Sequence, residues 1–218
     1  MNLQDYTEAA AKVGLSLTGC FHPTAEDAAP EGSRTLLLLG YGGASMWDAF
    51  NKAPEASDGS PHGIDRWSKR TVDQLANDWG GQAVYPFGGP PYQPFIRWTF
   101  KGEPLHQSRL GMAIHEQKGL WPGWRGAIGL PSAIDLPPVK RSTSPCAPCP
   151  APCITACPVS AFSDAGYDTV TCRAHLNTDA GAECRKAGCL ARRACPVGLD
   201  FAQSAEQAAF HLEAFRVA

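Results

Sequence analysis

The sequence predicts an α+β protein with two domains, residues 1–138 and residues 139–218. Helix-like and strand-like patterns share the first part, and a Pro- and Ser-rich stretch at residues 131–145 separates it from the rest. Eight of the nine cysteines then fall between Cys146 and Cys195. The boundary is therefore expected near residue 139, before a cysteine-rich second domain that ends in a helix.

In the first domain, local patterns predict the elements in order. A helix is expected over residues 5–13, because Gly14 can end it in a left-handed conformation. Residues 15–20 alternate apolar and small side chains, as a strand does. The apolar run at residues 35–39 indicates a buried strand, and the glycine-rich turn after it leads to a helix over residues 44–50.

The following patterns predict a longer helix and further strands. Apolar side chains recur at helical spacing over residues 64–79, and a strand is expected at residues 82–86. A Gly- and Pro-rich loop then leads into an aromatic segment, which we expect to be loop and strand over residues 85–100. Residues 124–130 form another strand candidate, and residues 200–215 a helix.

The composition is that of a folded protein and argues against several classes of partner. Its hydrophobic fraction is 44% and its net charge is −2, so we expect no nucleic acid partner. No apolar run reaches the roughly 20 residues of a membrane helix, and the first residues lack a secretory signal. We expect a cytoplasmic location and no membrane partner. Clustered thiols in that compartment favour metal or cluster binding over disulfides.

The cysteine motif is CAPCPAPCITACP, in which Cys146, Cys149, Cys153 and Cys157 precede Pro158. Bacterial ferredoxins bind [4Fe–4S] clusters with C-x2-C-x2-C-x3-C-P, whose fourth cysteine ligates the other cluster in two-cluster proteins. Here one residue is inserted between the second and third cysteines. Closely spaced thiolates on a tight loop can ligate three iron atoms of one cluster, so the motif favours iron–sulfur ligation.

A second set of cysteines supplies the remaining ligands for two [4Fe–4S] clusters. By the crossed ferredoxin pattern, one cluster takes Cys146, Cys149, Cys153 and Cys195. The other cluster takes Cys157, Cys172, Cys184 and Cys189. A single cluster, structural zinc and disulfides remain alternatives, although only the first pair has the spacing of a zinc knuckle. The spacing defines Cys184 least well, and Cys20 is expected to be a buried small hydrophobe.

The second domain resembles the ferredoxin module of epoxyqueuosine reductases, which pair two such clusters with a cobalamin. The matching elements are CITACP, Asp168 before Cys172, Leu176, Gly188-Cys189 and Cys195-Pro196. The last motif lacks its middle cysteine, because Arg192 or a neighbour stands there, and Cys184 is the expected substitute. These reductases also use a catalytic acid in an Arg-Asp pair. In the comparable region this chain has Ser108-Arg109-Leu110, which argues against epoxyqueuosine reduction.

The first domain resembles the cobalamin-processing CblC family over roughly residues 15–138. Three stretches carry the resemblance: RTLLLLGYGGASMWDAF, IHEQKGLWPGWRGAIGLP and AIDLPP. The resemblance implies a flavin-reductase or nitroreductase-like α+β fold that holds cobalamin instead of flavin.

The resemblance and the chemistry of a corrin together suggest site residues in the first domain. A corrin needs an apolar and aromatic floor with donors for its amide rim. The candidate catalytic residues are Arg125 and His115. The candidate cofactor-binding residues are Gly42, Gly43, Met46, Tyr92, Gln93, Arg97, Trp98, His115, Trp124 and Arg125. For each of these, packing in a core or a surface ion pair is the alternative explanation.

The leading hypothesis is a redox protein that binds cobalamin and reduces it or removes its upper ligand. The electrons would come from its own two [4Fe–4S] clusters, which an unknown low-potential donor must reload. A cobalamin-dependent enzyme is a further candidate partner. The alternatives are a non-enzymatic cobalamin chaperone or electron carrier, a flavin oxidoreductase of the same fold, and an epoxyqueuosine-reductase-like enzyme.

Overall fold

A computed structural model describes residues 1–217, which divide into two compact units. Unit 1 contains Met1–Pro104 and Gly123–Lys140. Unit 2 contains Leu105–Pro122 and the chain from Arg141 onward. Residues 105–122, which the sequence assigned to the first domain, therefore belong by their contacts to the second unit. None of the described helices is long and apolar enough to cross a membrane.

Unit 1 contains a four-stranded antiparallel sheet in the order β1-β2-β6-β3. The strands are β1 (Ser16–Phe21), β2 (Thr35–Tyr41), β3 (Gln82–Val84) and β6 (Gly123–Leu130). Along β2, Leu37 and Leu39 pack into one hydrophobic cluster, while Leu36 and Leu38 pack into another. Successive side chains of a strand point to opposite faces of the sheet. Both faces are buried here, so the strand has an apolar residue at each of these positions.

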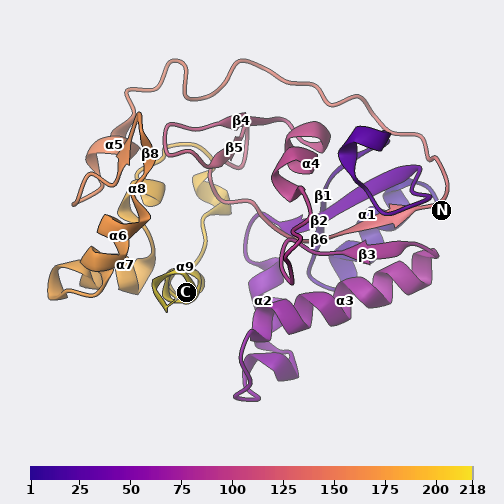
Figure 1. Cartoon of the computed structure of the whole chain (residues 1–218), viewed down its shortest axis with the longest axis horizontal. Helices are drawn as coiled ribbons and strands as arrows, with labels where there is room; N and C mark the ends of the chain where they lie inside the picture. The colour runs from indigo at the N-terminus through magenta and orange to yellow at the C-terminus, as the bar shows by residue number, and fades with distance from the viewer. Residues whose placement is uncertain (218) are drawn as a thin grey trace. The chain divides into compact units, whose positions relative to one another are not determined.

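Helices cover both faces of this sheet (Figure 1). The helices are α1 (Leu3–Lys12), α2 (Ser45–Asn51), α3 (Gly63–Trp79) and α4 (Phe95–Gly102). The first three pack on the face that carries Leu37, and α4 packs on the face that carries Leu36. Short 3-10 turns are η1 (Ala25–Asp27) and η2 (Pro54–Ala56). Unit 1 is thus a layered α+β fold with the sheet in the middle.

Capping explains where the helices of unit 1 begin and end. At the start of α1, Asn2 accepts a hydrogen bond from the Asp5 N–H at 3.1 Å, and the Asp5 carboxylate accepts one from the Asn2 N–H at 2.7 Å. This reciprocal capping box satisfies two amide groups that a helix start leaves unpaired. At the other end of α3, Gly80 adopts a left-handed conformation with φ 63°, which favours glycine.

The helix α4 differs from the sequence prediction, which expects loop and strand over residues 85–100. Its aromatic side chains resemble those of a strand, and three prolines stand in the five residues before it. However, its buried positions are Phe95, Trp98, Thr99 and Gly102. These positions follow the i, i+3, i+4, i+7 spacing of one helix face, and this period outweighs the β propensity of the individual residues.

Unit 2 is built from short elements. Its hairpins pair β4 (Leu105–Gln107) with β5 (Ala113–His115), and β7 (Phe162–Ser163) with β8 (Gly166–Tyr167). Its helices are α5 (Pro152–Thr155), α6 (Thr169–Leu176), α7 (Ala182–Ala187), α8 (Leu190–Arg193) and α9 (Ala205–Val217). The 3-10 turns η3 (Asp179–Gly181) and η4 (Leu199–Phe201) connect them.

The core of unit 2 explains why residues 105–122 belong to it. Leu110, Ile114 and Leu120 from this segment are buried with Phe162 and Ala191. Several of the clustered cysteines pack against the same core. The two parts of the chain therefore share one hydrophobic cluster, which a boundary drawn at a single point in the sequence cannot represent.

Candidate functional site

The eight clustered cysteines of unit 2 line two cavities, with four thiols in each. The first thiol cavity is lined by Cys146, Cys149, Cys153 and Cys195. The second thiol cavity is lined by Cys157, Cys172, Cys184 and Cys189. All of them are free thiols. The crossed ferredoxin pattern divides the cysteines in the same way, although their role as ligands stays a prediction.

Turns around α5 and α8 bring the first four thiols together. The longer spacing between Cys149 and Cys153 contains Ala151, whose φ of 60° places it in the left-handed region. Pro152 then begins α5, where its fixed φ and missing N–H suit the first helical position. The additional residue relative to the ferredoxin motif is therefore absorbed by a turn. Cys195 reaches the same cavity from the end of α8.

The second set of thiols comes from α6, α7 and the connections beside them. Asp168 caps α6 by accepting a hydrogen bond from the Thr171 N–H at 2.9 Å, and this fixes the helix that carries Cys172. Gly188, with φ 83°, turns the chain from α7 to Cys189. A Cβ atom there would lie 2.7 Å from the Cβ of Ala208, so the turn requires glycine for space as well as conformation.

The pKa shifts group the thiols in the same two sets. Burial raises the pKa of the Cys195 thiol, and Cys153, Cys146 and Cys149 raise it further. Burial also raises the pKa of Cys184, and the charges of Cys172 and Cys157 add to this effect. Crowded, buried thiolates are unfavourable unless a cationic group binds them. Without a bound cation these cysteines therefore favour the protonated thiol, and ligation would release their protons.

Four thiolates are a donor set that both zinc and a [4Fe–4S] cluster use. Four thiolates around one zinc ion would converge at about 2.3 Å from it, whereas a [4Fe–4S] cluster spreads its four ligands over four iron corners. Among residues 1–217, no group of three or more His, Cys, Asp or Glu side chains is arranged to hold a single metal ion.

Hydrogen-bond donors point at several of these sulfurs. The Ala161 N–H donates to Cys157 Sγ at 3.3 Å. Backbone N–H groups of Ala191 and Arg192, at the start of α8, interact in the same way with Cys189. Such bonds stabilise negative charge on cluster sulfurs and raise the reduction potential. The Tyr167 hydroxyl adds a side-chain donor: burial raises the pKa of this phenol, and its hydrogen bond to Cys172 raises it further.

In unit 1, the predicted residue Arg125 lies beside an open cavity of about 510 Å³. Its guanidinium donates to Asp65 Oδ1 at 2.8 Å and lies over the Phe87 ring, 5.5 Å from the centroid. Asp65 and Phe87 both line the cavity, as does Tyr92. Arg125 Nε is buried and has no hydrogen-bond partner among the described residues. The unit 1 cavity thus has a polar wall, and behind it Arg125 Nε is a hydrogen-bond donor without a partner among the described residues.

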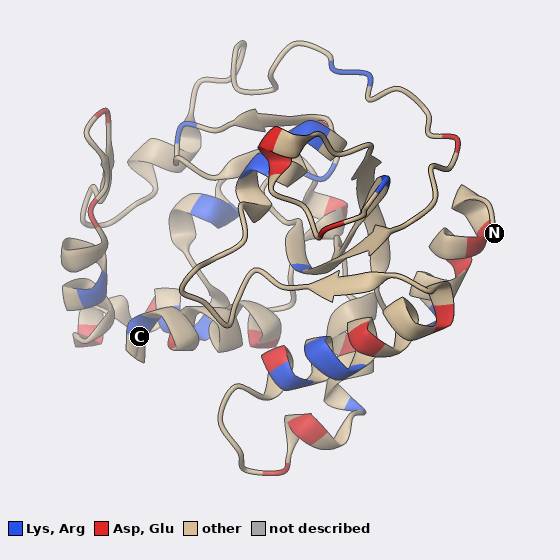
Figure 2. Ribbon diagram, turned by 45° about the vertical axis from the view of Figure 1, so that its right-hand side comes forward, with Lys and Arg blue, Asp and Glu red and all other residues tan. Residues whose placement is uncertain are grey.

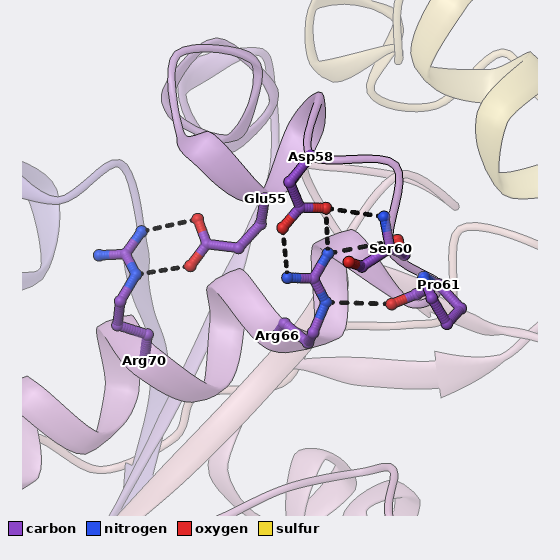
Figure 3. A network of polar contacts seen from close by, with 6 residues as sticks. All are labelled: Glu55, Asp58, Ser60, Pro61, Arg66 and Arg70. Carbon is purple, nitrogen blue, oxygen red and sulfur yellow. Dashed lines mark hydrogen bonds and ion pairs between the residues drawn. The ribbon is translucent and has the colours of Figure 1, made fainter.

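A network of ion pairs holds the wall of the unit 1 cavity (Figure 3). Arg66 makes a bidentate pair with Asp58, with both N–O distances 2.7 Å, and also donates to the Pro61 carbonyl at 3.0 Å. The Arg66 guanidinium lowers the pKa of the Asp58 carboxyl to about 2. One turn further along α3, Arg70 pairs with Glu55 at 2.6 Å. The loop before α3 is therefore fixed to this helix by charge pairs.

Most of the other residues predicted for a cofactor pocket do not line this cavity. Met46 and Trp98 are fully buried, on opposite faces of the sheet. Trp98 Nε1 donates to the Asp27 carbonyl at 2.7 Å, and Arg97 donates to the Glu26 carbonyl at 2.8 Å. These contacts hold η1 against α4, which is a structural role.

The remaining predicted residues of unit 1 lie in three other places. Gly42 and Gly43 form the turn between β2 and α2, where Gly43 has φ 108°. The Gln93 carbonyl accepts a hydrogen bond from the Phe95 N–H at 2.8 Å, just before α4. Trp124 Nε1 donates to the buried carboxylate of Glu103 at 2.6 Å. The cofactor-binding role of these residues stays a prediction.

His115 belongs to unit 2, whereas Arg125 belongs to unit 1. It is buried on β5, and its Nδ1 accepts hydrogen bonds from the Gln117 N–H at 3.0 Å and the Lys118 N–H at 3.2 Å. Burial lowers the pKa of His115 to about 4, and nearby Lys118 adds to this effect. The imidazole is therefore neutral at pH 7 and closes the turn after β5.

Sequence reasoning missed two residues that line the cavities. Asp65 contacts Arg125 across the fold of unit 1, so no local pattern marks it. His175 lines the second thiol cavity with Cys172. Its signal was present, because a residue three positions after a ligand on a helix lies on the same face.

No protein-family model and no curated protein matches this chain. Among solved structures, it resembles an epoxyqueuosine reductase crystallised with an epoxyqueuosine-modified tRNA-Tyr stem loop. The TM-score is 0.56 at 14% identity, over 93% of this chain and 66% of that chain. The chain thus spans just under two thirds of that protein's length. A selenomethionine-labelled epoxyqueuosine reductase gives a TM-score of 0.55 at 12% identity, over 94% of this chain and 68% of the other.

A third similar structure is the epoxyqueuosine reductase from Bacillus subtilis, with its aspartate-bearing catalytic loop swung out of the active site. It has a TM-score of 0.56 at 12% identity and covers 94% of this chain and 68% of its own. At such identities the similarity establishes the fold. The chain is an α+β protein with a cysteine-rich unit. Its fold resembles that of epoxyqueuosine reductases, while a CblC-like, nitroreductase-like first domain stays a prediction.

Proposed function

We propose that this chain is an iron–sulfur oxidoreductase, in which two [4Fe–4S] clusters in unit 2 supply electrons for a reduction. The observation that carries the proposal is the division of eight free thiols into two four-thiol cavities. The resemblance in fold to reductases supports it. When bound, such clusters provide one-electron transfers at low potential.

The protein's own residues would hold the clusters and control their surroundings. Ile114, Leu120 and Val197 line the first thiol cavity, and Leu176, Leu190 and Leu212 line the second. These side chains exclude water from the thiolates, and the backbone N–H groups described above stabilise the sulfur charge. Burial and hydrogen bonding act in opposite directions on the potential of a cluster, so both cavities can be tuned without a change of ligand.

An epoxyqueuosine-reductase-like activity is the first candidate for the reaction. The similar structures carry that name, and one of them was crystallised with a tRNA stem loop, so a structured RNA becomes a candidate partner. Figure 2 shows Lys and Arg interleaved with Asp and Glu along α3, as in the Lys69–Asp73 pair.

Arg109 stands where the reductases carry their Arg-Asp pair, and it lines the first thiol cavity. The acid of such a reaction would therefore come from elsewhere, and Asp65 is the carboxylate of the unit 1 cavity.

Cobalamin reduction, upper-ligand removal or cobalamin delivery is the second candidate. Arg125 beside the unit 1 cavity, with an unpartnered Nε in the described part of the chain, is the observation that favours it. The fit is partial, because Met46 and Trp98 are buried in separate clusters, while Phe87 and Tyr92 of the predicted aromatic segment line this cavity. We therefore derive no chemical step that passes through a corrin.

Anaerobic reconstitution of the full chain with iron and sulfide tests the cluster proposal. We expect about eight iron atoms per chain, a visible spectrum typical of [4Fe–4S] clusters and an EPR signal after reduction. Cys149→Ser and Cys172→Ser should each remove about half of the iron, and the matched control Cys20→Ser should remove none. Stoichiometric zinc, or an iron content that ignores these substitutions, would contradict the proposal.

Turnover then separates the two candidate reactions. The reduced protein is mixed with an epoxyqueuosine-modified tRNA stem loop in one series, and with cyano- or methylcobalamin in the other. Multiple turnovers on the stem loop support the first candidate, and multiple turnovers on cobalamin support the second. Binding of cobalamin at one molecule per chain, without turnover, supports the delivery role instead.

A further inference from the structure

The second thiol cavity contains a histidine that no prediction used. His175 lies on α6, three residues after Cys172, and both side chains line this cavity. The imidazole Nε2 is buried, and the residues that the structure describes offer it no hydrogen-bond partner. A buried polar nitrogen is unfavourable without a partner, so this position favours a bound acceptor.

Among the side chains that line this cavity, the acceptors for Nε2 are the four thiol sulfurs and the Tyr167 hydroxyl. The cavity wall consists of four thiols, apolar side chains and Tyr167. The Tyr167 hydroxyl already hydrogen-bonds to Cys172. Thiolate and sulfide sulfurs are acceptors only, so an imidazole nitrogen that hydrogen-bonds to them must donate an N–H.

Contacts at both ends of α6 hold His175 in place. Asp168 caps the first turn, and Arg185 binds the carbonyls of Leu176 at 2.5 Å and Thr178 at 2.6 Å beyond the last turn. Gly181 approaches so closely that an added Cβ would lie 2.3 Å from the His175 carbonyl oxygen. These contacts fix the backbone of α6 at His175.

We propose that His175 donates an Nε2–H hydrogen bond to a sulfur of the cluster in the second thiol cavity, and thereby raises the reduction potential of that cluster. The inference rests on the proposed function. Reduction adds one electron to the cluster and increases the negative charge on its sulfurs. A hydrogen bond to sulfur is stronger in the reduced form, and no proton is transferred and no bond to iron forms.

The effect should be confined to one cluster. The polar side chains that line the first thiol cavity are Ser108 and Arg109. Ser108 Oγ accepts a hydrogen bond from the Leu110 N–H at 3.3 Å, and Arg109 donates to the Cys146 carbonyl at 3.4 Å. No imidazole lines that cavity, so His175 distinguishes the two clusters.

Redox titration of the reconstituted full chain, followed by EPR, tests this inference. Replacement of His175 by Phe keeps a ring but removes the donor, and His175→Gln keeps an N–H. We expect His175→Phe to lower one midpoint potential enough to change the equilibrium constant for electron exchange between the clusters at least threefold, about 28 mV for one electron. His175→Gln should recover part of the shift. The control His22→Phe, at an exposed position of unit 1, should leave both potentials unchanged.

Assignment of the affected potential uses the ligand variants. The signal that shifts should be the one that Cys172→Ser abolishes and Cys149→Ser retains. Two unshifted potentials in His175→Phe would overturn the inference. Loss of about half the iron in both His175 variants would also overturn it, since His175 would then hold the cluster instead of tuning it. A wild-type protein that assembles no cluster would instead refute the proposed function itself.

Discussion

At the scale of single residues, the pair between Arg125 and Asp65 is the most informative contact of unit 1. The Arg125 side chain is 12% exposed and the Asp65 side chain 31%, so the pair is shielded on one side only. Because Nε of Arg125 already lacks a partner in the described chain, Asp65 is the main acceptor for this buried charge. The pair therefore contributes to the stability of unit 1, and it also places a carboxylate in the wall of the unit 1 cavity.

The substitution Asp65→Asn should lower the free energy of unfolding by about 1–3 kcal/mol, because a buried guanidinium loses its charged acceptor. Urea denaturation of both proteins measures the difference. As a control, Asp73→Asn removes the exposed ion pair with Lys69, while the amide oxygen can still accept the hydrogen bond from the Tyr85 hydroxyl, and stability should change by less than about 0.5 kcal/mol. Equal effects of the two substitutions would contradict this reading of the Arg125–Asp65 pair.

His115 should make stability depend on pH. An unfolded histidine titrates near pH 6.5, while burial lowers the pKa of His115 to about 4. As the pH falls through this window, the unfolded chain binds the proton first, so stability present above pH 6.5 is lost towards pH 4. The loss amounts to roughly 3 kcal/mol in total.

The substitution His115→Asn provides the comparison. An asparagine oxygen can accept the N–H groups of Gln117 and Lys118 without titrating in this range. The difference in unfolding free energy between the two proteins should therefore shrink as the pH is lowered from 7 to 4. A difference that is constant over this range would show that the buried imidazole does not titrate as inferred.

At the scale of elements, α6 connects a local signal in the sequence to the second thiol cavity. Asp168→Ala removes its cap and should lower the free energy of unfolding, whereas Asp168→Asn should retain most of the cap. The Ala variant should also lose iron from its second cluster faster in the presence of a chelator. Identical rates of iron loss in the Ala and Asn variants would show that the cap does not control this cavity.

The elements also show what the sequence could predict. The two cysteine sets were recognisable because closely spaced thiols and Cys-Pro pairs are local patterns, and β2 was recognisable from its run of leucines. By contrast, α4 was missed because its burial period competes with the strand propensity of its aromatic side chains. The contacts of Arg125 with Asp65 and Phe87 were not predictable, since residues far apart in the chain meet there.

At the scale of the whole molecule, the expected boundary near residue 139 differs from the two units because one segment crosses between them. No local pattern marks residues 105–122 as part of the cysteine-rich unit. Their assignment follows from Leu110, Ile114 and Leu120, which complete a core that the cysteine segment does not complete alone.

A pair of fragments should reveal this dependence. Residues 105–218 should assemble both clusters, whereas residues 139–218 should lose the first cluster and hold about half as much iron. The shorter fragment lacks Ile114 and Leu120, which line the first thiol cavity, and each buried side chain of this kind contributes about 1.5–3 kcal/mol. Anaerobic reconstitution with an iron assay compares them. Equal iron contents would show that residues 105–122 do not support the cavity.

The place of β6 in the chain has a consequence for biosynthesis. This strand lies between β2 and β3 in the sheet of unit 1, yet the ribosome makes it after residues 105–122 of unit 2. Unit 1 therefore cannot complete its sheet before part of unit 2 has been synthesised, and that part must wait for the cysteines. The two units have to mature in an interleaved order, and a continuous fragment that carries all of unit 2 also carries β6 of unit 1.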